Sequence, residues 1–463
     1  MAHGDSAIWH ATLALGAIHR QWESERHHRR PAAMLSDGVA FKRRALAHYF
    51  RAISLAKSIS DVPTLRALSV VLVAVSNVLG RWSDSQTHLF GGLRLLEREQ
   101  ERSGGIDGAA EVLERLDLQA MTFSDSQAPY PYQSPVWLQS LHKRLHGPQP
   151  ITSYGQAGTL LFALLRRFIL ISVNESESDS TGSRFHTLTV ELEAWEAKIQ
   201  VFESAHPREE LPALTIRIYH AQLRIWLAAS FDGAETRFDT DECLFYFERI
   251  VSLGERLSRE VDDRSVNPLS LEPAFVIPLF WTAHRCRHPQ LRRRAARVLW
   301  ECQRMEGMWS SDGAAFVVDR IIAVEEGVEC SDGSSSGASS PDTTAIGDLP
   351  DVPWDTWASS LPLVPGTVSW KGIEVIPESR RVKDVLVLVD YEIGRADIRM
   401  LFPDMLDPDE LVFIEDTVYF WTCGIGMSKD RMGLPELNDR PSYSYSSKGW
   451  CGSKRAFRTS LDH

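Results

Sequence analysis

Apolar side chains recur at intervals of three and four residues along most of the first 328 residues, which is the spacing of a buried helical face. Between Asp5 and Trp22, for example, Ile8, Ala11 and Ile18 fall on one stripe. The same spacing predicts further helices over 39–59, 64–79, 86–100, 110–124, 158–171, 185–202, 211–231 and 241–259. The pattern therefore predicts a mainly α fold, with helical hairpins packed around a common core.

The stretch 278–326 has the clearest helix boundaries. A His-Pro pair at 288–289 separates two helices, because the residue before a proline disfavours helical dihedrals and proline suits the first turn of a helix. We expect Gly307 to end the second helix, and Ser311 or Asp312 to cap a third.

The composition changes after residue 328. Residues 329–350 are rich in Ser, Gly and Asp, and they are predicted to form a flexible linker. Over 381–402 the apolar period shortens to two, which predicts a small β-hairpin with its turn near 392–395. We expect the strand-containing segment 351–403 to pack on the helical body, and the tail 404–463 to be irregular and poorly ordered.

Three separated strings occur in the stretch 278–326: CR-x-P-x-x-RR-x-A at 286–295, R-x-EG-x-W at 304–309 and I-x-x-x-EE at 321–326. In this order they resemble the late part of the regulatory region of fungal zinc-cluster transcription factors. The earlier strings ALGAIHR, ALAHYFRAISLA and QTHLFGGLRLLEREQ resemble helices of the same region. The resemblance spans roughly 8–326, and it implies that 1–328 is a helical regulatory domain. It also implies a nuclear protein that acts on transcription, often of a biosynthetic gene cluster.

That family reads DNA through a binuclear zinc cluster, which requires six cysteines in two closely spaced triplets. The cysteines of this chain are scattered, at Cys243, Cys286, Cys302, Cys330, Cys423 and Cys451. We therefore expect a regulatory domain that lacks its DNA-binding cluster, or a sequence from which the cluster has been lost. The resemblance implies protein partners, a small-molecule effector as an option, and DNA contact only through a missing or partner-supplied cluster.

Composition narrows the function classes further. The 463 residues are 43% hydrophobic and 24% charged, as in ordinary globular proteins. A formal net charge of −12 argues against non-specific binding of nucleic acid. The first residues lack the features of a secretory signal, and the longest apolar run, 67–79, is too short to span a bilayer. We expect an intracellular protein without a membrane partner.

No motif requires catalysis or a cofactor. The string GSSSG at 333–337 fits a nucleophile elbow, but it lies in the predicted linker and not at a strand-to-helix turn. His19 and His48 flank apolar stripes and are predicted to be packed histidines.

The arginine triplet 292–294 is predicted to be a polar helix face, paired with groups such as Glu301. Contact with a phosphate or an acidic partner is the alternative for this triplet. We predict no catalytic, cofactor-binding or metal-binding residues and therefore no enzyme. A standalone helical adaptor of a complete transcription factor stays open, as does, more remotely, a small-molecule enzyme.

Overall fold

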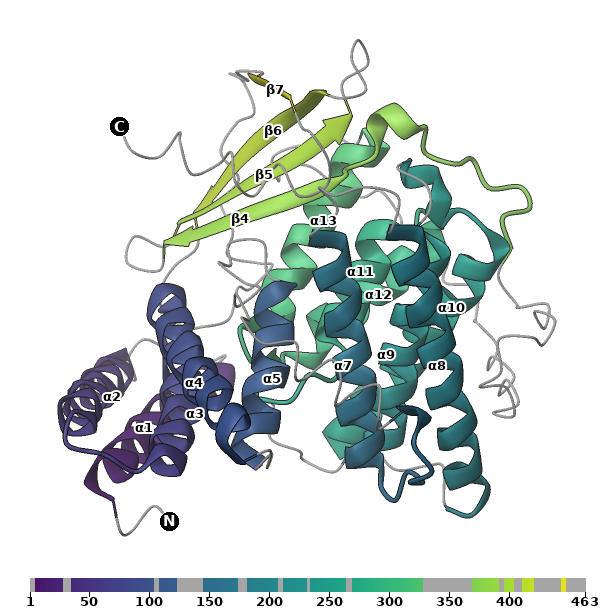
Figure 1. The fold of residues 1–463 in the computed structure, drawn as a ribbon. Coiled ribbons are helices and arrows are strands. Elements are labelled where there is room, and N and C mark those ends of the chain that lie inside the picture. Colours follow the sequence, from purple (N-terminus) through teal and green to yellow (C-terminus); the bar gives the residue numbers. More distant parts are fainter. Residues whose placement is uncertain are drawn as a thin grey trace.

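The computed structural model describes residues 5–27, 35–103, 108–122, 145–173, 181–206, 211–230, 234–263, 269–327, 369–390, 395–403, 410–419 and 443–446. This part of the chain is mainly helical, as predicted (Figure 1). Its α-helices are α1 (Ser6–His27), α2 (Leu35–Ala56), α3 (Val62–Val78), α4 (Trp82–Ser103), α5 (Gly108–Met121), α7 (Tyr154–Val173), α8 (Thr181–Ser204), α9 (Leu211–Ala228), α10 (Asp241–Asp263), α11 (Val276–Arg285), α12 (Pro289–Cys302) and α13 (Ser311–Glu326). Short 3-10 helices lie at η2 (Glu235–Phe238) and η3 (Glu378–Arg380).

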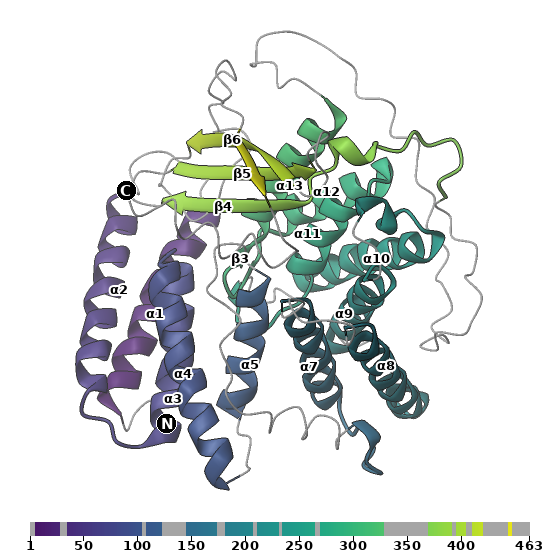
Figure 2. The same cartoon turned by 45° about the horizontal axis from the view of Figure 1, so that its top comes forward.

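Two small sheets accompany the helices. The first has the order β1-β2-β3, with β1 (Leu269–Ser270), β2 (Met305–Glu306) and β3 (Trp309–Ser310). The second is antiparallel with the order β4-β5-β6-β7, from β4 (Asp384–Asp390), β5 (Arg395–Pro403), β6 (Glu410–Tyr419) and β7 (Tyr443–Ser446). In both views the second sheet lies across one end of the helices α11 to α13 (Figures 1 and 2).

The predicted hairpin is confirmed as β4 and β5, which pair from Asp384–Leu401 to Asp390–Arg395. Their shared inner face, including Val385 and Met400, joins the main hydrophobic core, so this segment packs on the helical body. The expectation that 404–463 is irregular is wrong for β6 and β7. The run LVFI at 411–414 has the β-branched and aromatic residues that a paired strand favours, and β6 forms because β5 offers it an edge. The predicted linker 329–350 and the predicted hairpin turn lie largely or wholly outside the described residues.

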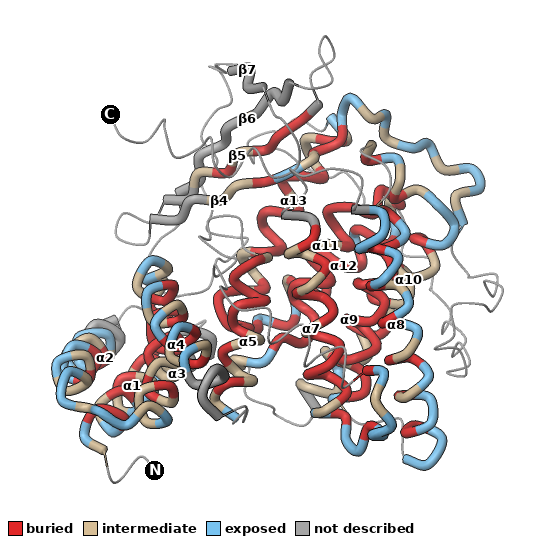
Figure 3. Tube along the Cα trace, viewed as in Figure 1, coloured by how far each residue is buried: buried red, intermediate tan, exposed pale blue. Residues whose placement is uncertain are grey.

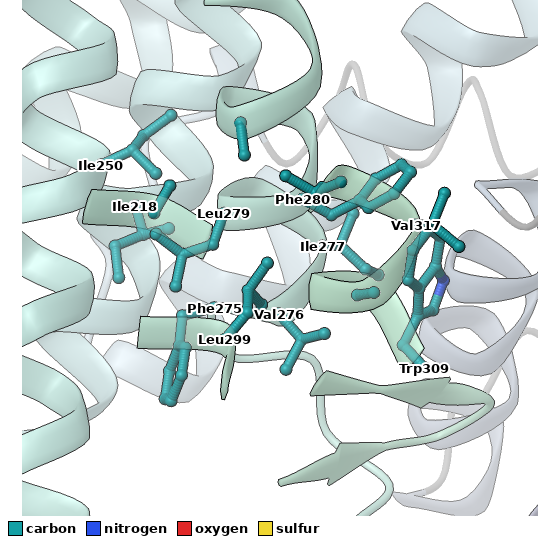
Figure 4. Packing of buried hydrophobic residues seen from close by; sticks show 14 of the residues in the cluster. Ile218, Ile250, Phe275, Val276, Ile277, Leu279, Phe280, Leu299, Trp309 and Val317 are labelled. Atoms are coloured by element: carbon teal, nitrogen blue, oxygen red, sulfur yellow. The ribbon is translucent and has the colours of Figure 1, made fainter. Parts of the chain in front are cut away.

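Three clusters of buried apolar side chains hold the helices together (Figure 3). The largest joins α4, α5 and α9 to α13 with the inner face of the second sheet. Figure 4 shows its centre, where Phe275, Leu279 and Phe280 of α11 and its start pack among residues of α9, α10, α12 and α13. A second cluster lies between α7, α8 and α9, and a third between α1, α2 and α3.

Of the three helix boundaries predicted in 278–326, one is confirmed and two are wrong. Pro289 is the first residue of α12, as predicted, but the cap of α13 is Ser310, whose hydroxyl accepts a hydrogen bond from Gly313 N. The prediction that Gly307 ends α12 is wrong, because the helix ends at Gln303 in a left-handed conformation (φ 41°). Gly307 instead follows β2 in the tight turn to β3, with a φ of 57°.

The turn at Gly307 gives the first testable prediction. A Cβ at this position would collide with the side-chain amide of Gln119, and the left-handed backbone adds strain of its own. We expect Gly307→Ala to lower the free energy of unfolding by about 2–4 kcal/mol in urea titrations. Gly372→Ala is the matched control, because its φ of 77° is similar but its Cβ would meet open space. An equal effect of the two substitutions would contradict the packing against Gln119.

Candidate functional site

The first and third of the family-like strings meet in one buried arrangement of charges. We call it the arginine–glutamate network: Arg285, Arg287, Arg292, Glu235 and Glu325, each at most 2% exposed. Arg287 lies in the short connection between α11 and α12, and Arg292 lies in the first turns of α12. Glu325 comes from the end of α13, and Glu235 begins η2. Three parts of the chain that are distant in sequence, η2, the junction of α11 and α12, and the end of α13, therefore contribute to one site.

In this network each of the two carboxylates is bound by two guanidinium groups. Arg287 Nη2 donates to Glu325 Oε1 at 2.9 Å, and Arg287 Nη1 donates to Glu235 Oε2 at 3.0 Å. Arg292 Nη2 donates to the other oxygen of Glu325 at 2.7 Å. Arg285 forms a second ion pair with Glu235 at 2.7 Å. The planar guanidinium allows one arginine to hold two carboxylates at fixed angles, which an ammonium group cannot do.

Burial and charge act in opposite directions on these groups. Burial disfavours the charge of Arg287, but Glu325 and Glu235 outweigh it and raise the pKa of that guanidinium. For Glu235, burial is likewise opposed by Arg285 and Arg287, and the net result is a lowered pKa. Arg287 and Glu235 are therefore both charged at neutral pH, so this contact is an ion pair and not a poised acid and base.

The network also anchors the second sheet. Val382, two residues before β4, donates its N–H to Glu325 Oε1 at 2.8 Å. Its carbonyl oxygen accepts from His284 Nε2 and from Arg287 Nη2, both at 3.1 Å. The side chain of Glu378 accepts from the backbone N–H groups of Glu235 and Thr236, at 2.8 and 3.0 Å. The segment that leads into the sheet is thus bound by the same residues that join α11, α12 and α13.

The second string forms a separate buried turn. Glu306 is fully buried, and its carboxylate accepts from the backbone N–H groups of Ala274, Phe275 and Val276 at 2.8–3.2 Å. These N–H groups lie at the start of α11, where an acidic side chain is favourable. Arg304 Nε donates to the same carboxylate at 2.8 Å. The string R-x-EG-x-W therefore encodes a cap for α11, with Gly307 providing the turn.

Two of the three histidines in the earlier strings, His48 and His88, make polar contacts between helices α1, α2 and α4. His48 Nδ1 is 2.8 Å from His10 Nδ1, and Tyr49 Oη is 2.7 Å from His88 Nε2. Burial raises the pKa of Tyr49 and lowers that of His88, so at neutral pH the phenol keeps its proton and the imidazole is neutral. His19 lies apart, with its ring 6.3 Å from that of Trp22.

The arginine triplet does not form the polar face that we expected. Arg292 is fully buried on Glu325, and Arg294 is 7% exposed and donates to Glu255 of α10 at 2.9 and 2.7 Å. Only the middle residue, Arg293, is largely exposed, and it pairs with Glu326. The expected partner Glu301 is exposed. The prediction failed because the partners lie on other helices, where sequence periodicity gives no information.

The described residues offer little room or reactivity for chemistry. Burial raises the pKa of the thiols of Cys243, Cys286 and Cys302 to about 11, 12 and 12, so they are not thiolates at neutral pH. Within the described ranges, no group of three or more His, Cys, Asp or Glu side chains is placed to hold a metal ion. The string 333–337 and the other three cysteines lie outside the described residues.

One described cavity lies between α3, α4, α5 and the turn at Met308. It has a volume of about 10 Å³ and is lined by polar groups of Asn77, Ser85, Gln86 and Gln119. A space of this size holds about one water molecule, whereas sites for small organic ligands start at roughly 300 Å³. This cavity is therefore not a substrate or effector site.

One helix in the described part of the chain, α7, is long and apolar enough to cross a membrane over Tyr154–Ile171. Of that window 61% is buried inside the protein, as in the core helix of a folded domain. Its length and composition alone are weak evidence for a membrane span.

Comparison with known proteins adds no relative: no family model, no curated protein and no solved structure matches this chain. The candidate site thus rests on its own geometry. Sequence reasoning located the correct stretches, since Arg287, Arg292 and Glu325 lie within the quoted strings, although Arg285 lies just before the first of them. The sequence did not indicate that Glu235 belongs to the site. Its only distinguishing feature is that it lies with an arginine in the short run ETRF ahead of α10.

The charge network gives a stability prediction. Glu325→Ala would leave Arg287 and Arg292 buried without their shared carboxylate, and we expect it to lower the free energy of unfolding by about 3–5 kcal/mol. Glu301→Ala, an exposed acid on α12, should change it by less than about 0.5 kcal/mol. Urea unfolding of both variants checks this, and comparable values for the two would refute the network as a structural anchor.

The buried histidine beside the network gives a pH prediction. Burial first, and then Arg285 and Arg287, hold the pKa of His284 well below its usual range, so the folded protein keeps this side chain neutral. Below about pH 6.5 the unfolded chain binds a proton that the folded chain does not, so stability falls as the pH falls. Between pH 7.5 and 5.5 we expect this one residue to account for a loss of about 1 kcal/mol. Urea titrations at both pH values should show a smaller loss for His284→Gln than for the parent, and an equal loss would contradict the assignment.

Proposed function

We propose that this chain is the regulatory domain of a transcription regulator of the fungal zinc-cluster type, and that it acts in the nucleus through protein partners and not as an enzyme. By the same resemblance, its targets are the genes of a biosynthetic cluster. One observation carries the proposal: the strings that resemble this family are used together in the structure. Glu325 of the third string binds Arg287 and Arg292 of the first, and Glu306 of the second string caps α11, the helix that precedes them.

These contacts between the strings support the proposal, because strings that matched the family by chance would not be expected to contact one another in the folded chain. Here an arginine of the first string and a glutamate of the third are 38 residues apart and form a hydrogen bond of 2.9 Å in the interior. The titratable groups described above are engaged in such internal pairs, which agrees with a structural framework and gives no support for a catalytic centre.

A standalone adaptor is the second candidate. It is favoured by the placement of Cys243, Cys286 and Cys302, which are buried on different elements and cannot contribute to a zinc cluster together. Such an adaptor would bind a complete factor and reach DNA only through it. An uncharacterised small-molecule enzyme stays the most remote alternative.

The test tethers the full chain to a heterologous DNA-binding domain and measures a reporter in a fungal host. We expect the tethered chain to change reporter transcription, Glu301→Ala to keep the effect, and Glu325→Ala to lose it because the domain no longer folds. If only co-expression of a complete zinc-cluster factor changes the reporter, the adaptor is the correct candidate. A folded chain that changes no reporter under either condition would refute both.

A further inference from the structure

The helix α2 lies at the outer margin of the helices α1 to α4 in both ribbon views (Figures 1 and 2). Its inner face, which includes Ala45, Tyr49 and Ala52, is buried in the apolar cluster shared with α1 and α3. The hydroxyl of Tyr49 is 2.7 Å from His88 Nε2 of α4 and accepts a hydrogen bond from Ser76 of α3 at 3.3 Å. These contacts fix which face of α2 points outward.

The outward face of α2 is strongly basic. Residues 38–60 contain five Lys or Arg side chains and no Asp or Glu, and all five are exposed: Lys42, Arg43, Arg44, Arg51 and Lys57. None of the five forms an ion pair with an acidic side chain in the part of the chain that the structure describes. The arginines of the arginine–glutamate network, by contrast, are each bound to a carboxylate. The positive charge of α2 is therefore not used to hold the described fold together.

We call Lys42, Arg43, Arg44, Phe50 and Arg51 the basic face of α2. Arg44 and Arg51 are seven residues apart, so they lie on one line along the helix, about 10 Å from each other. Arg43 and Phe50 form a neighbouring line with the same spacing. The exposed positions between the two lines are small: Ala40, Ala47 and Ser54. A carboxylate that approaches this face meets no acid of α2 and little steric obstruction.

Phe50 adds an apolar contact among these charges. It is 54% exposed, although phenylalanine is usually buried. Its ring centroid is 5.8 Å from the guanidinium carbon of Arg81, just ahead of α4. Phenylalanine and arginine are enriched at protein–protein interfaces, whereas lysine is depleted there. Three arginines around an exposed ring therefore favour a protein partner.

The uneven distribution of charge along the chain narrows the choice of partner. Residues 1–103 carry 14 Lys or Arg and 9 Asp or Glu, a net charge of +5, so the remaining residues carry −17 of the total of −12. A second copy would bring two basic faces together, and their like charges repel. A DNA duplex longer than α2 would meet the acidic remainder, and five cations bind phosphates only weakly at physiological salt. A short acidic segment suits this face best.

We propose that the basic face of α2 binds an acidic peptide segment of a partner protein. Carboxylates of the segment contact the arginines, whose planar guanidinium groups bind carboxylates in a bidentate manner. An apolar side chain of the segment covers Phe50. Because water and salt compete for exposed charges, we expect a dissociation constant in the micromolar range that rises with ionic strength. The inference rests on the charges of α2 and not on the proposed role in transcription.

Fluorescence anisotropy of labelled synthetic peptides, titrated with the full chain, tests the proposal. The acidic probe has the length of α2, a glutamate at every third or fourth position and one central leucine. The control peptide has glutamine in place of each glutamate. We expect the acidic probe to bind at about 50 mM salt, and at least about tenfold more weakly at about 300 mM. The glutamine peptide should not bind.

Variants of the chain locate the contact. Arg44→Glu combined with Arg51→Glu should weaken binding of the acidic probe at least about tenfold. The matched control is Arg184→Glu combined with Arg297→Glu, which changes the net charge equally on exposed residues of α8 and α12 and should bind like the parent. Phe50→Ala should weaken binding of the acidic probe but not of a version without the leucine. Unchanged thermal unfolding of these variants shows that any loss is not a loss of fold.

Three outcomes would overturn the proposal. The first is an equal loss of binding for the two double variants, which would mean a general effect of net charge. The second is a parent that binds the glutamine peptide as tightly as the acidic probe, or neither of them. The third is a DNA duplex of comparable length that binds more tightly than the acidic probe and depends on Arg44 and Arg51, which would assign the basic face to nucleic acid.

Discussion

The carboxylate of Glu325 is the group on which the arrangement of this fold depends. It receives one guanidinium from the connection between α11 and α12, a second from α12 itself, and the N–H group of Val382 ahead of the second sheet. Each donor lies where water cannot replace the carboxylate, so none of the three can leave without exposing an unpaired charge or dipole to the interior. The apolar cluster around α11 binds the sheet with little directional preference, whereas these bonds fix where the sheet begins and which way it runs.

The same principle recurs across the molecule. Although the chain carries a net charge of −12, eleven arginines are buried among the described residues, against seven acidic side chains. On α8, buried glutamates bind arginines of α7 and α9. Each ion pair therefore fixes which helix packs on α8 and at which axial position. Apolar residues of the same volume would often give equal stability. We infer that the ion pairs contribute registry among helices whose apolar faces alone would pack in several ways.

The helices could be predicted from the sequence, but the contacts between them could not. Periodicity located α1 to α13 because a buried stripe repeats within each segment, and Pro289 marked the start of α12 directly. The end of α12 was not predicted because Gln303 adopts a left-handed conformation, which is uncommon for glutamine and so cannot be expected from the residue type. Arg287 and Glu235 are 52 residues apart, and no local pattern connects them. The quoted strings therefore indicated where the site lies, but not that its residues bind one another.

The burial of these strings bears on where function is to be sought. Arg287, Arg292, Glu306 and Glu325 are each at most 1% exposed, so a partner or an effector cannot touch them in the folded protein. A resemblance carried by such residues concerns the framework of the domain and not the surface with which it acts. What distinguishes this chain from others with the same framework must lie on exposed residues.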